Sequence, residues 1–491
     1  MQATVTILSL LFLACIQSFT VIASESEWIE SHHTMQIQSQ NISYHASVGA
    51  LPLSDSEDKP AATMGFISYE KEPKDQTRPI TFVFNGGPGS ASVWLHMGAF
   101  GPKRVYLDDS ESFDPSQLKL ADNEASLLTF TDLVFIDPVE TGFSRKVRDS
   151  NEEFFSPEDD AKSVAKFIQM YISKRNRWLS PKYLAGESYG TTRSVLVADI
   201  LHHNHLLSVS GIILVSSVLD FNTIRFGGSQ NFLPYALILP SLSATAWYHQ
   251  KLDESLQELP LNELLDQAKN FVMEEYLPFL YRLGLSITPE AEEAMALKLA
   301  KFTGLSSSFI RKNKFMIEEY KFRKKILLDE GYIVGRFSGT FKGEALDDTH
   351  SFPMYDPSSD LIEGAFKAGV EHHLRMNLGV EDLEDYKVFG EGVWEHWDWG
   401  KYAQNEYVCV SDKLRSLMIK SPKLKVFVAN GYYDLATPFF ATEYTFGKLM
   451  LNAKQQARLT MAYYKGGHMM YTNSGERLKL RNDLEGFFTN P

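Results

Sequence analysis

A serine at the centre of a glycine-flanked pentapeptide is the side chain whose surroundings most favour chemistry. Residues 186–190 read Gly-Glu-Ser-Tyr-Gly, and no other part of the chain matches the pattern Gly-x-Ser-x-Gly. A strand-like run at 182–185 precedes the motif and an apolar helical pattern follows it. Because a serine in a strand–turn–helix setting projects above the sheet, we predict that Ser188 is a nucleophile. The alternative is a glycine-rich turn that carries an ordinary surface serine.

A histidine and an aspartate late in the chain could activate this serine, whose hydroxyl needs a base to attack an acyl carbon. His468 lies in a Gly-Gly-His loop just after a strand-like run, and Asp434 follows the preceding run of that kind. The order serine, aspartate, histidine is that of α/β-hydrolase triads. We predict that His468 takes the proton of Ser188, and that Asp434 orients the imidazole and stabilises its positive form. Other candidate bases come before Asp434 in the chain: His96, His202 and His203.

A glycine-rich loop could supply half of an oxyanion hole. Residues 85–90 read Asn-Gly-Gly-Pro-Gly-Ser and follow a strand-like run at 79–84. Bare glycine backbone lets amide groups approach a ligand, and glycine-rich loops serve the oxyanion holes of lipases in this way. We therefore predict that the backbone amides of Gly87 and Tyr189 donate to the oxyanion. The alternative is a simple turn without chemistry.

Together, five motifs resemble those of the serine carboxypeptidase family. They are the loop at 85–89, the segment Pro-Val-Glu-Thr-Gly-Phe-Ser at 138–144, the elbow at 186–190, and the later segments at 430–434 and 466–468. They follow the family's order over roughly residues 75 to 470. The resemblance implies a serine-type carboxypeptidase, an enzyme that removes the last residue of a peptide.

The resemblance also implies a grip on the C-terminal carboxylate of the substrate by Asn85, Gly86 and Glu187. A protonated glutamic acid can donate a hydrogen bond to that carboxylate, whereas an ionised one would repel it. The family favours acidic pH for this reason, and a buried carboxyl group with a raised pKa would support such a preference.

Three positions depart from the family's pattern. Ala99 stands where the family has a second glutamate that shares a proton with the first, Val83 replaces a tryptophan, and Glu140 replaces a glycine. Because Ala99 removes the expected partner of Glu187, an esterase or acyltransferase on the same scaffold is the alternative function. A binding protein on an inactive hydrolase scaffold is a further alternative, which the complete triad disfavours.

The elements around these motifs predict a mostly parallel sheet. Apolar runs bounded by Gly, Pro, Asn and Asp are typical of buried strands. They occur at 79–84, 132–136, 182–185, 211–215, 425–429 and 459–464. A helix is expected after Ser156, which can cap it, with Pro157 in its first turn. The alternation of strands and helices predicts an α/β-hydrolase fold, with a mostly parallel central sheet flanked by helices.

Helical patterns dominate between residues 226 and 405, which predicts a helical cap insertion over the site. The helical stretches are 252–272, 289–302, 308–328 and 365–378. The predicted hydrolase core then consists of residues 40–225 and 406–491. For the aromatic run at 394–399 we favour packing over pocket lining. For Trp247 and Tyr248 the choice stays open.

Charge and cysteine content limit the setting of the protein. The net charge of −14 argues against binding to nucleic acid or to an anionic membrane. Residues 1–23 read as a cleaved signal peptide, and no later run is long enough to span a bilayer. Cys15 and Cys409 are the only cysteines, so loss of Cys15 with the signal would leave no intramolecular disulfide. An export signal without disulfides favours a periplasmic or secreted protein of the bacterial envelope, with a lipoprotein the lesser option.

No motif indicates a metal or another cofactor. The chain has neither His-Glu-x-x-His nor paired-cysteine spacing. The clusters at 347–350 and 371–373 are expected to be solvated faces. We therefore expect an enzyme without a cofactor whose partner is a peptide substrate, with the side-chain preference and the oligomeric state left open.

Overall fold

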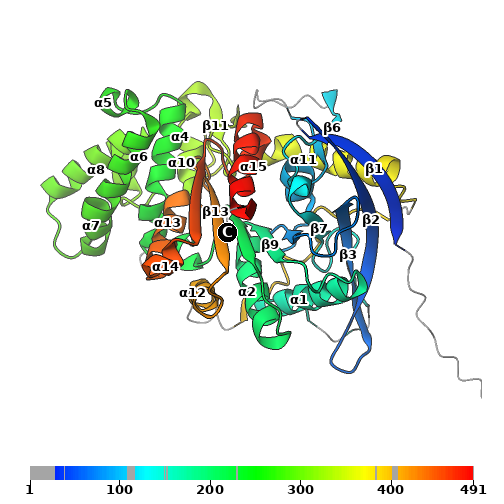
Figure 1. Cartoon of the computed structure of the whole chain (residues 1–491). Coiled ribbons are helices and arrows are strands. Elements are labelled where there is room, and N and C mark those ends of the chain that lie inside the picture. Colours follow the sequence, from blue (N-terminus) through cyan, green and yellow to red (C-terminus); the bar gives the residue numbers. More distant parts are fainter. Residues whose placement is uncertain are drawn as a thin grey trace, which may run out of the picture.

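The computed structural model describes residues 28–489, apart from 38, 108–116, 149, 151–152, 228–230, 382–383 and 401–406. The predicted signal peptide and Cys15 lie outside the described residues. A single large sheet runs through the molecule, with helices on both of its faces (Figure 1). In the described part of the chain, no helix combines the length and the hydrophobicity that a bilayer span requires.

Six parallel strands form the centre of this sheet, as the apolar runs predicted. Their spatial order is β7-β4-β9-β10-β13-β14. They are β4 (Ile80–Phe84), β7 (Asp132–Ile136), β9 (Lys182–Glu187), β10 (Gly211–Val215), β13 (Lys425–Gly431) and β14 (Leu459–Tyr464). Every residue of β4, β7, β9 and β10 is buried, which is why these strands read as continuous apolar runs rather than alternating ones.

Three antiparallel strands extend the sheet beyond β7, and the sequence reading missed them. They are β1 (Ile29–Ile37), β2 (Gln40–Ser54) and β3 (Pro60–Lys71), with the short β8 (Arg145–Lys146) paired to β3. Figure 1 shows them as the long blue ribbons at one end of the sheet. Strand β1 is exposed over most of its length, so its many polar residues hide the strand pattern.

Two layers of helices cover the central strands. α1 (Pro157–Lys174), α2 (Tyr189–Asn204) and α12 (Ser411–Lys420) pack on one face, and α11 (Pro357–His372) and α15 (Ser474–Thr489) pack on the other. Neighbouring strand residues point to opposite faces: Phe82 and Phe84 meet the first layer, and Val83 meets the second. The predicted start of α1 is confirmed, because the Ser156 hydroxyl accepts a hydrogen bond from the Asp159 amide at 3.2 Å.

A mainly helical segment separates β10 from β13. It contains α3 (Leu233–Leu237), α4 (Leu239–Tyr248), α5 (Glu254–Gln257), α6 (Leu261–Phe271), α7 (Leu277–Arg282), α8 (Pro289–Thr303), α9 (Ser307–Lys312), α10 (Glu319–Lys325) and α11, with a hairpin of β11 (Tyr332–Val334) and β12 (Lys342–Glu344). Helices α3 to α10 share a hydrophobic cluster with the loop after β13 and the start of the helix at Phe439–Lys448. The predicted helices at 252–272 and 308–328 are each broken in two, at Pro260 and at Lys314 and Phe315, whose φ angles are 53° and 63°.

The remaining elements are short. Among them are the hairpin of β5 (Lys103–Val105) and β6 (Leu120–Asp122), the helical turn η1 (Leu95–Phe100), and the helices α13 (Phe439–Lys448) and α14 (Ala453–Gln456) between β13 and β14. The segment after β14 leads through His468 into α15.

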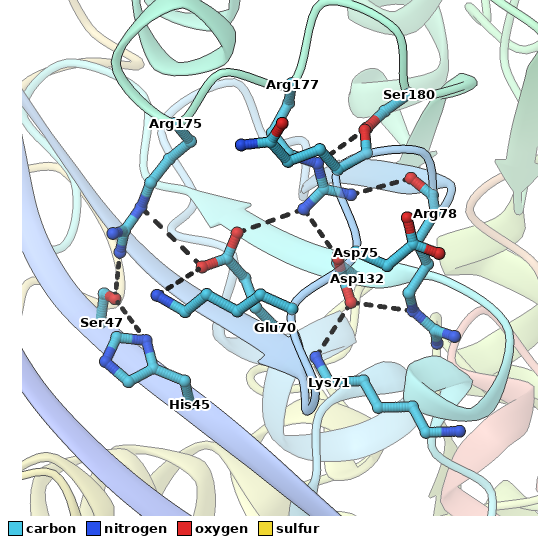
Figure 2. A network of polar contacts seen from close by, with 12 residues as sticks. His45, Ser47, Glu70, Lys71, Asp75, Arg78, Asp132, Arg175, Arg177 and Ser180 are labelled. Carbon is cyan, nitrogen blue, oxygen red and sulfur yellow. Dashed lines mark hydrogen bonds and ion pairs between the residues drawn. The ribbon is translucent and has the colours of Figure 1, made fainter.

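A buried ion-pair network ties the antiparallel strands to the amino ends of the central strands (Figure 2). The Arg177 guanidinium donates to Asp132 at 2.7 Å and to Glu70 at 3.2 Å, and Arg78 donates to the other oxygen of Asp132 at 2.9 Å. Asp132 begins β7 and Glu70 is near the end of β3, so one arginine joins both strands. The network lies at the amino ends of the parallel strands, since Asp132 is the first residue of β7. Ser188 follows the carboxyl end of β9, so the network and the predicted nucleophile lie at opposite ends of the parallel strands.

Candidate active site

Ser188 occupies a strained turn between strand β9 and helix α2. Strand β9 ends at Glu187 and α2 begins at Tyr189, so Ser188 alone makes the turn, with φ 59° and ψ −130°. The flanking glycines are required by close contacts. A Cβ on Gly186 would lie 2.0 Å from the carbonyl oxygen of Gly190. The turn leaves Ser188 partly exposed on the wall of a cavity.

The loop after β4 lies directly against this turn. A Cβ on Gly86 would approach the backbone nitrogen of Tyr189 to 2.6 Å, so only glycine allows the two segments to meet. Gly87 and Tyr189, the predicted oxyanion donors, line the same cavity as Ser188. The arrangement therefore places two backbone segments beside the nucleophile, as an oxyanion hole requires.

A buried ion pair holds this loop in place. Arg193 of α2 donates to Asp160 of α1 at 2.7 Å, and its guanidinium also donates to the carbonyl oxygen of Asn85. The side-chain oxygen of Asn85 in turn accepts from the Leu95 amide at 3.1 Å. Arg193 thus connects both helices beneath the sheet to the loop that faces Ser188.

His468 and Asp434 are brought together as the sequence predicted. Nδ1 of His468 lies 2.8 Å from Oδ2 of Asp434, and both side chains are buried. Asp434 also accepts hydrogen bonds from the Ala436 and Thr437 amides at 2.8 and 2.9 Å. His468 and Ser188 line one cavity, while no hydrogen bond joins them within the described residues. Hydrogen bonds between nucleophile and base are often long without substrate and tighten when it binds.

Charge stabilises the proton on this histidine. Burial lowers the pKa of His468, but the Asp434 carboxylate beside it reverses the effect and the net pKa is raised. Burial raises the pKa of Asp434, and the imidazole and Thr437 outweigh it, so that this pKa is lowered. A carboxylate that stays ionised can orient the imidazole and stabilise its positive form.

Glu187 is a buried carboxyl group next to the nucleophile, with 3% of its surface exposed. Burial raises its pKa from 4.5 to about 7, against the lowering effects of His468, Tyr471 and Asn85. The group is therefore mainly protonated below neutral pH, and it lies on the wall of the cavity that Ser188 lines.

Tyr471 is the functional partner that the sequence reading missed. Its hydroxyl donates to Oε2 of Glu187 at 2.6 Å. Its ring fills the space beside η1, where a Cβ on Gly98 would lie 2.6 Å from the ring. Ala99, where the family's pattern has a second glutamate, is the next residue of η1 and is also buried. The only signal of Tyr471 in the sequence is its position three residues after His468.

The other two departures have structural roles. Glu140 adopts φ 70°, a left-handed conformation that favours glycine. Its carboxylate accepts from the Lys146 amide at 2.7 Å and lies 3.3 Å from the Lys387 ammonium, which helps to hold that conformation. Val83 is buried in the core on the α15 side of the sheet.

The alternative bases lie away from the triad. His96 is buried and bonds the Tyr69 hydroxyl at 2.7 Å, while His202 and His203 are in the last turn of α2. The prediction of a solvated face at 371–373 is wrong for His373, which is buried and lies 2.8 Å from the Tyr69 hydroxyl, because α11 packs against the sheet there.

The aromatic residues of the helical segment divide between packing and lining. Trp247 packs, with its ring nitrogen donating to the Leu259 carbonyl at 3.1 Å. Trp397 packs edge-on against Tyr189, with ring centroids 5.3 Å apart. Trp394 lines the cavity, so packing was the wrong interpretation for that residue, which is 53% exposed.

The cavity has a volume of about 540 Å³ and mixes residues from the sheet and from the helical segment. Ser188 and His468 face it from segments that follow β9 and β14, and Glu187 faces it from the last position of β9. Charged residues add to its wall: Arg225, Glu319, Arg336 and Glu363. A cavity of this size can take a small peptide or an ester beside the nucleophile.

The family model and the curated relatives identify one family. The model of the serine carboxypeptidase family matches residues 40–482. Pheromone-processing carboxypeptidase KEX1 of Saccharomyces cerevisiae is 25% identical over 358 residues, which are 66% of this chain and 47% of that protein. Serine carboxypeptidase-like 45 of Arabidopsis thaliana is 26% identical over 191 residues, 38% of this chain and 40% of that protein. The chain thus matches about half, or less, of the length of these relatives.

A solved structure shows the same fold. The prohormone-processing carboxypeptidase Kex1 from Saccharomyces cerevisiae matches with a TM-score of 0.55 at 18% identity, over 90% of this chain and 91% of that one. The predicted α/β-hydrolase fold is confirmed by this likeness and by the mostly parallel sheet flanked by helices.

Proposed function

The chain belongs to the serine carboxypeptidase family, and from this we propose that it releases C-terminal residues from peptides through an acyl-enzyme intermediate. One observation carries the proposal: the buried Glu187 beside Ser188, with a pKa of about 7. Such a carboxyl group is protonated in mildly acidic solution and can donate a hydrogen bond to a carboxylate. A neutral ester substrate has no carboxylate that could accept a hydrogen bond from this group.

The reaction follows from the arrangement around Ser188. His468 removes the hydroxyl proton as Ser188 attacks the last peptide carbonyl, and the amides of Gly87 and Tyr189 stabilise the oxyanion. The C–N bond then breaks as His468 passes its proton to the departing amine. Water, deprotonated by His468, attacks the acyl-enzyme, and the shortened peptide leaves with Ser188 restored.

The leaving residue is held by its own carboxylate. Glu187 donates its proton into that hydrogen bond, and the Asn85 side chain and the Gly86 backbone, which line the cavity with it, add polar contacts. A peptide with an amidated C-terminus lacks the carboxylate and loses this interaction. Hydrogen bonds to charged groups contribute about 1.5–3 kcal/mol, so amidation should reduce kcat/KM by about 10- to 100-fold.

The test compares an N-blocked dipeptide, its C-terminal amide and a matched ester at pH 6. We expect release of the last amino acid from the free acid at a rate well above that from the amide. Ser188→Ala should abolish turnover, while Ser173→Ala, on the exposed face of α1, should not change it. Fast ester cleavage without dipeptide cleavage would instead establish the esterase or acyltransferase function.

A further inference from the structure

Arg225 brings to the cavity a positive charge that no described carboxylate neutralises. Its guanidinium carbon lies 5.6 Å from the centres of the Phe221 and Trp399 rings and 6.0 Å from that of Trp394. Aromatic faces hold a cation in place without cancelling its charge. Among the described residues, none forms an ion pair with this guanidinium. Arg225 lines the same cavity as Ser188.

The other charged groups on the wall have an ionic partner or a pKa that is raised toward the neutral form. Arg336 lies 3.6 Å from the Glu319 carboxylate, so these two charges offset each other. Burial raises the pKa of Glu363, with Asp360 adding to the effect. Glu187, as described, is protonated below about pH 7. Of the two arginines on this wall, Arg225 is the one without an ion pair among the described residues. Partial burial together with repulsion from Arg336 lowers its pKa.

The position of Arg225 relative to the scissile bond follows from the two hydrophobic layers. Phe221 belongs to the core on the α1 and α2 face of the sheet, together with Tyr189, and Trp399 packs against that core with its ring 6.3 Å from the Tyr189 ring. Tyr471, the partner of Glu187, belongs to the core on the opposite face. Ser188 stands in the chain between Glu187, whose partner Tyr471 belongs to one core, and Tyr189, which belongs to the other. The leaving residue is held on the Glu187 side, so the Arg225 side receives the acyl part of the peptide.

We propose that Arg225 forms a subsite for an acidic side chain, glutamate or aspartate, on the residue that precedes the scissile bond. The planar guanidinium can donate two parallel hydrogen bonds to such a carboxylate, with the aromatic rings keeping it in position. This inference rests on the proposed carboxypeptidase function and names the substrate class that the function would favour.

The experiment compares hydrolysis of benzyloxycarbonyl-Glu-Phe with that of benzyloxycarbonyl-Gln-Phe, which has the same shape without the charge. At pH 6 the glutamate side chain is ionised, and we expect its kcat/KM to exceed that of the glutamine peptide by at least about tenfold. Arg225→Gln should bring this ratio close to one. Arg282→Gln, an exposed arginine of α7 outside the cavity, should leave the ratio unchanged. The ratio is internal to each preparation, so partial misfolding does not affect it.

A charge reversal and a binding measurement complete the test. Arg225→Glu should shift the preference toward benzyloxycarbonyl-Lys-Phe. Equal rates for the Glu and Gln peptides in the unchanged enzyme would overturn the subsite while leaving the carboxypeptidase proposal intact. If Arg225→Gln altered only the preference for the leaving residue, the acyl-side assignment would be wrong. If no peptide is cleaved, the proposed function fails. The subsite can then still be tested by calorimetric measurement of the affinities of the Glu and Gln peptides for Ser188→Ala, and equal affinities would refute it.

Discussion

The hydrogen bond from Tyr471 to Glu187 predicts a specific change in pH dependence. Tyr471→Phe removes the donor at 2.6 Å but keeps the ring that packs on Gly98. A hydrogen bond to a charged group contributes about 1.5–3 kcal/mol, and 1.36 kcal/mol corresponds to one pKa unit. Because the donor stabilises the ionised form, its loss should raise the pKa of Glu187 from about 7 by roughly one to two units.

The assay is the pH profile of kcat/KM for an N-blocked dipeptide. Protonation of His468 sets the acidic limb, since the base must be neutral, and ionisation of Glu187 sets the alkaline limb, since only the protonated group can hold the carboxylate of the leaving residue. The two groups influence each other's pKa, so the limbs report the pair. In Tyr471→Phe the alkaline limb should move upward by roughly one unit or more while the acidic limb stays close to its place.

Two comparisons make this prediction refutable. A matched ester has no free carboxylate, so its profile should lack the limb due to Glu187 in both proteins. Tyr276→Phe removes a hydroxyl that is equally buried and donates to the Phe315 carbonyl at 2.5 Å in the helical segment, and it should leave both limbs in place. An unchanged alkaline limb in Tyr471→Phe, or an equal shift for the ester, would refute the role assigned to Tyr471.

Three further predictions concern the carboxyl group, the triad and the ion-pair network. The folded pKa of Glu187, about 7, lies above its ordinary value of 4.5, so its ionisation destabilises the fold as pH rises between these values. Between pH 4 and pH 8 the unchanged protein should therefore lose about 3 kcal/mol of unfolding free energy relative to Glu187→Gln. Urea denaturation of both proteins at the two pH values measures this difference. Asp434→Asn should lower kcat by about 10³- to 10⁴-fold on peptide and ester alike, with no loss in melting temperature large enough to explain it. Arg177→Met leaves Asp132 and Glu70 buried without their shared partner and should cost about 3–5 kcal/mol of stability. The more exposed Lys74→Met should cost less than about 1 kcal/mol, and comparable losses would contradict the network's importance.

The parallel strands were predictable because their signal is local. Strands such as β4 and β10 are buried on both faces and read as unbroken apolar runs with glycine or polar residues at their ends. The nucleophile turn was equally accessible, because the close contacts of Gly86 and Gly186 allow no side chain and leave a recognisable motif.

The parts that escaped prediction depend on contacts between distant segments. Strand β1 is paired only along one edge and is mostly exposed, so its sequence carries little apolar signal. Tyr471 reaches Glu187 across 284 positions of sequence, and nothing local marks it as a partner. The role proposed for Arg225 depends on three aromatic rings near its guanidinium, two of which come from a distant part of the sequence.

The contribution of helices α3 to α10 to the cavity has a consequence for how the cavity wall can vary. Ile238 and Glu319 of the cavity wall come from the segment of helices α3 to α10, whereas Ser188, Asp434 and His468 follow strands of the sheet. Side-chain substitutions at these two positions can therefore change the cavity without altering the strands that carry the triad. The backbone carbonyls of Arg336 and Phe337, in contrast, accept hydrogen bonds from the amides of Leu435 and His468, which ties that part of the wall to the triad.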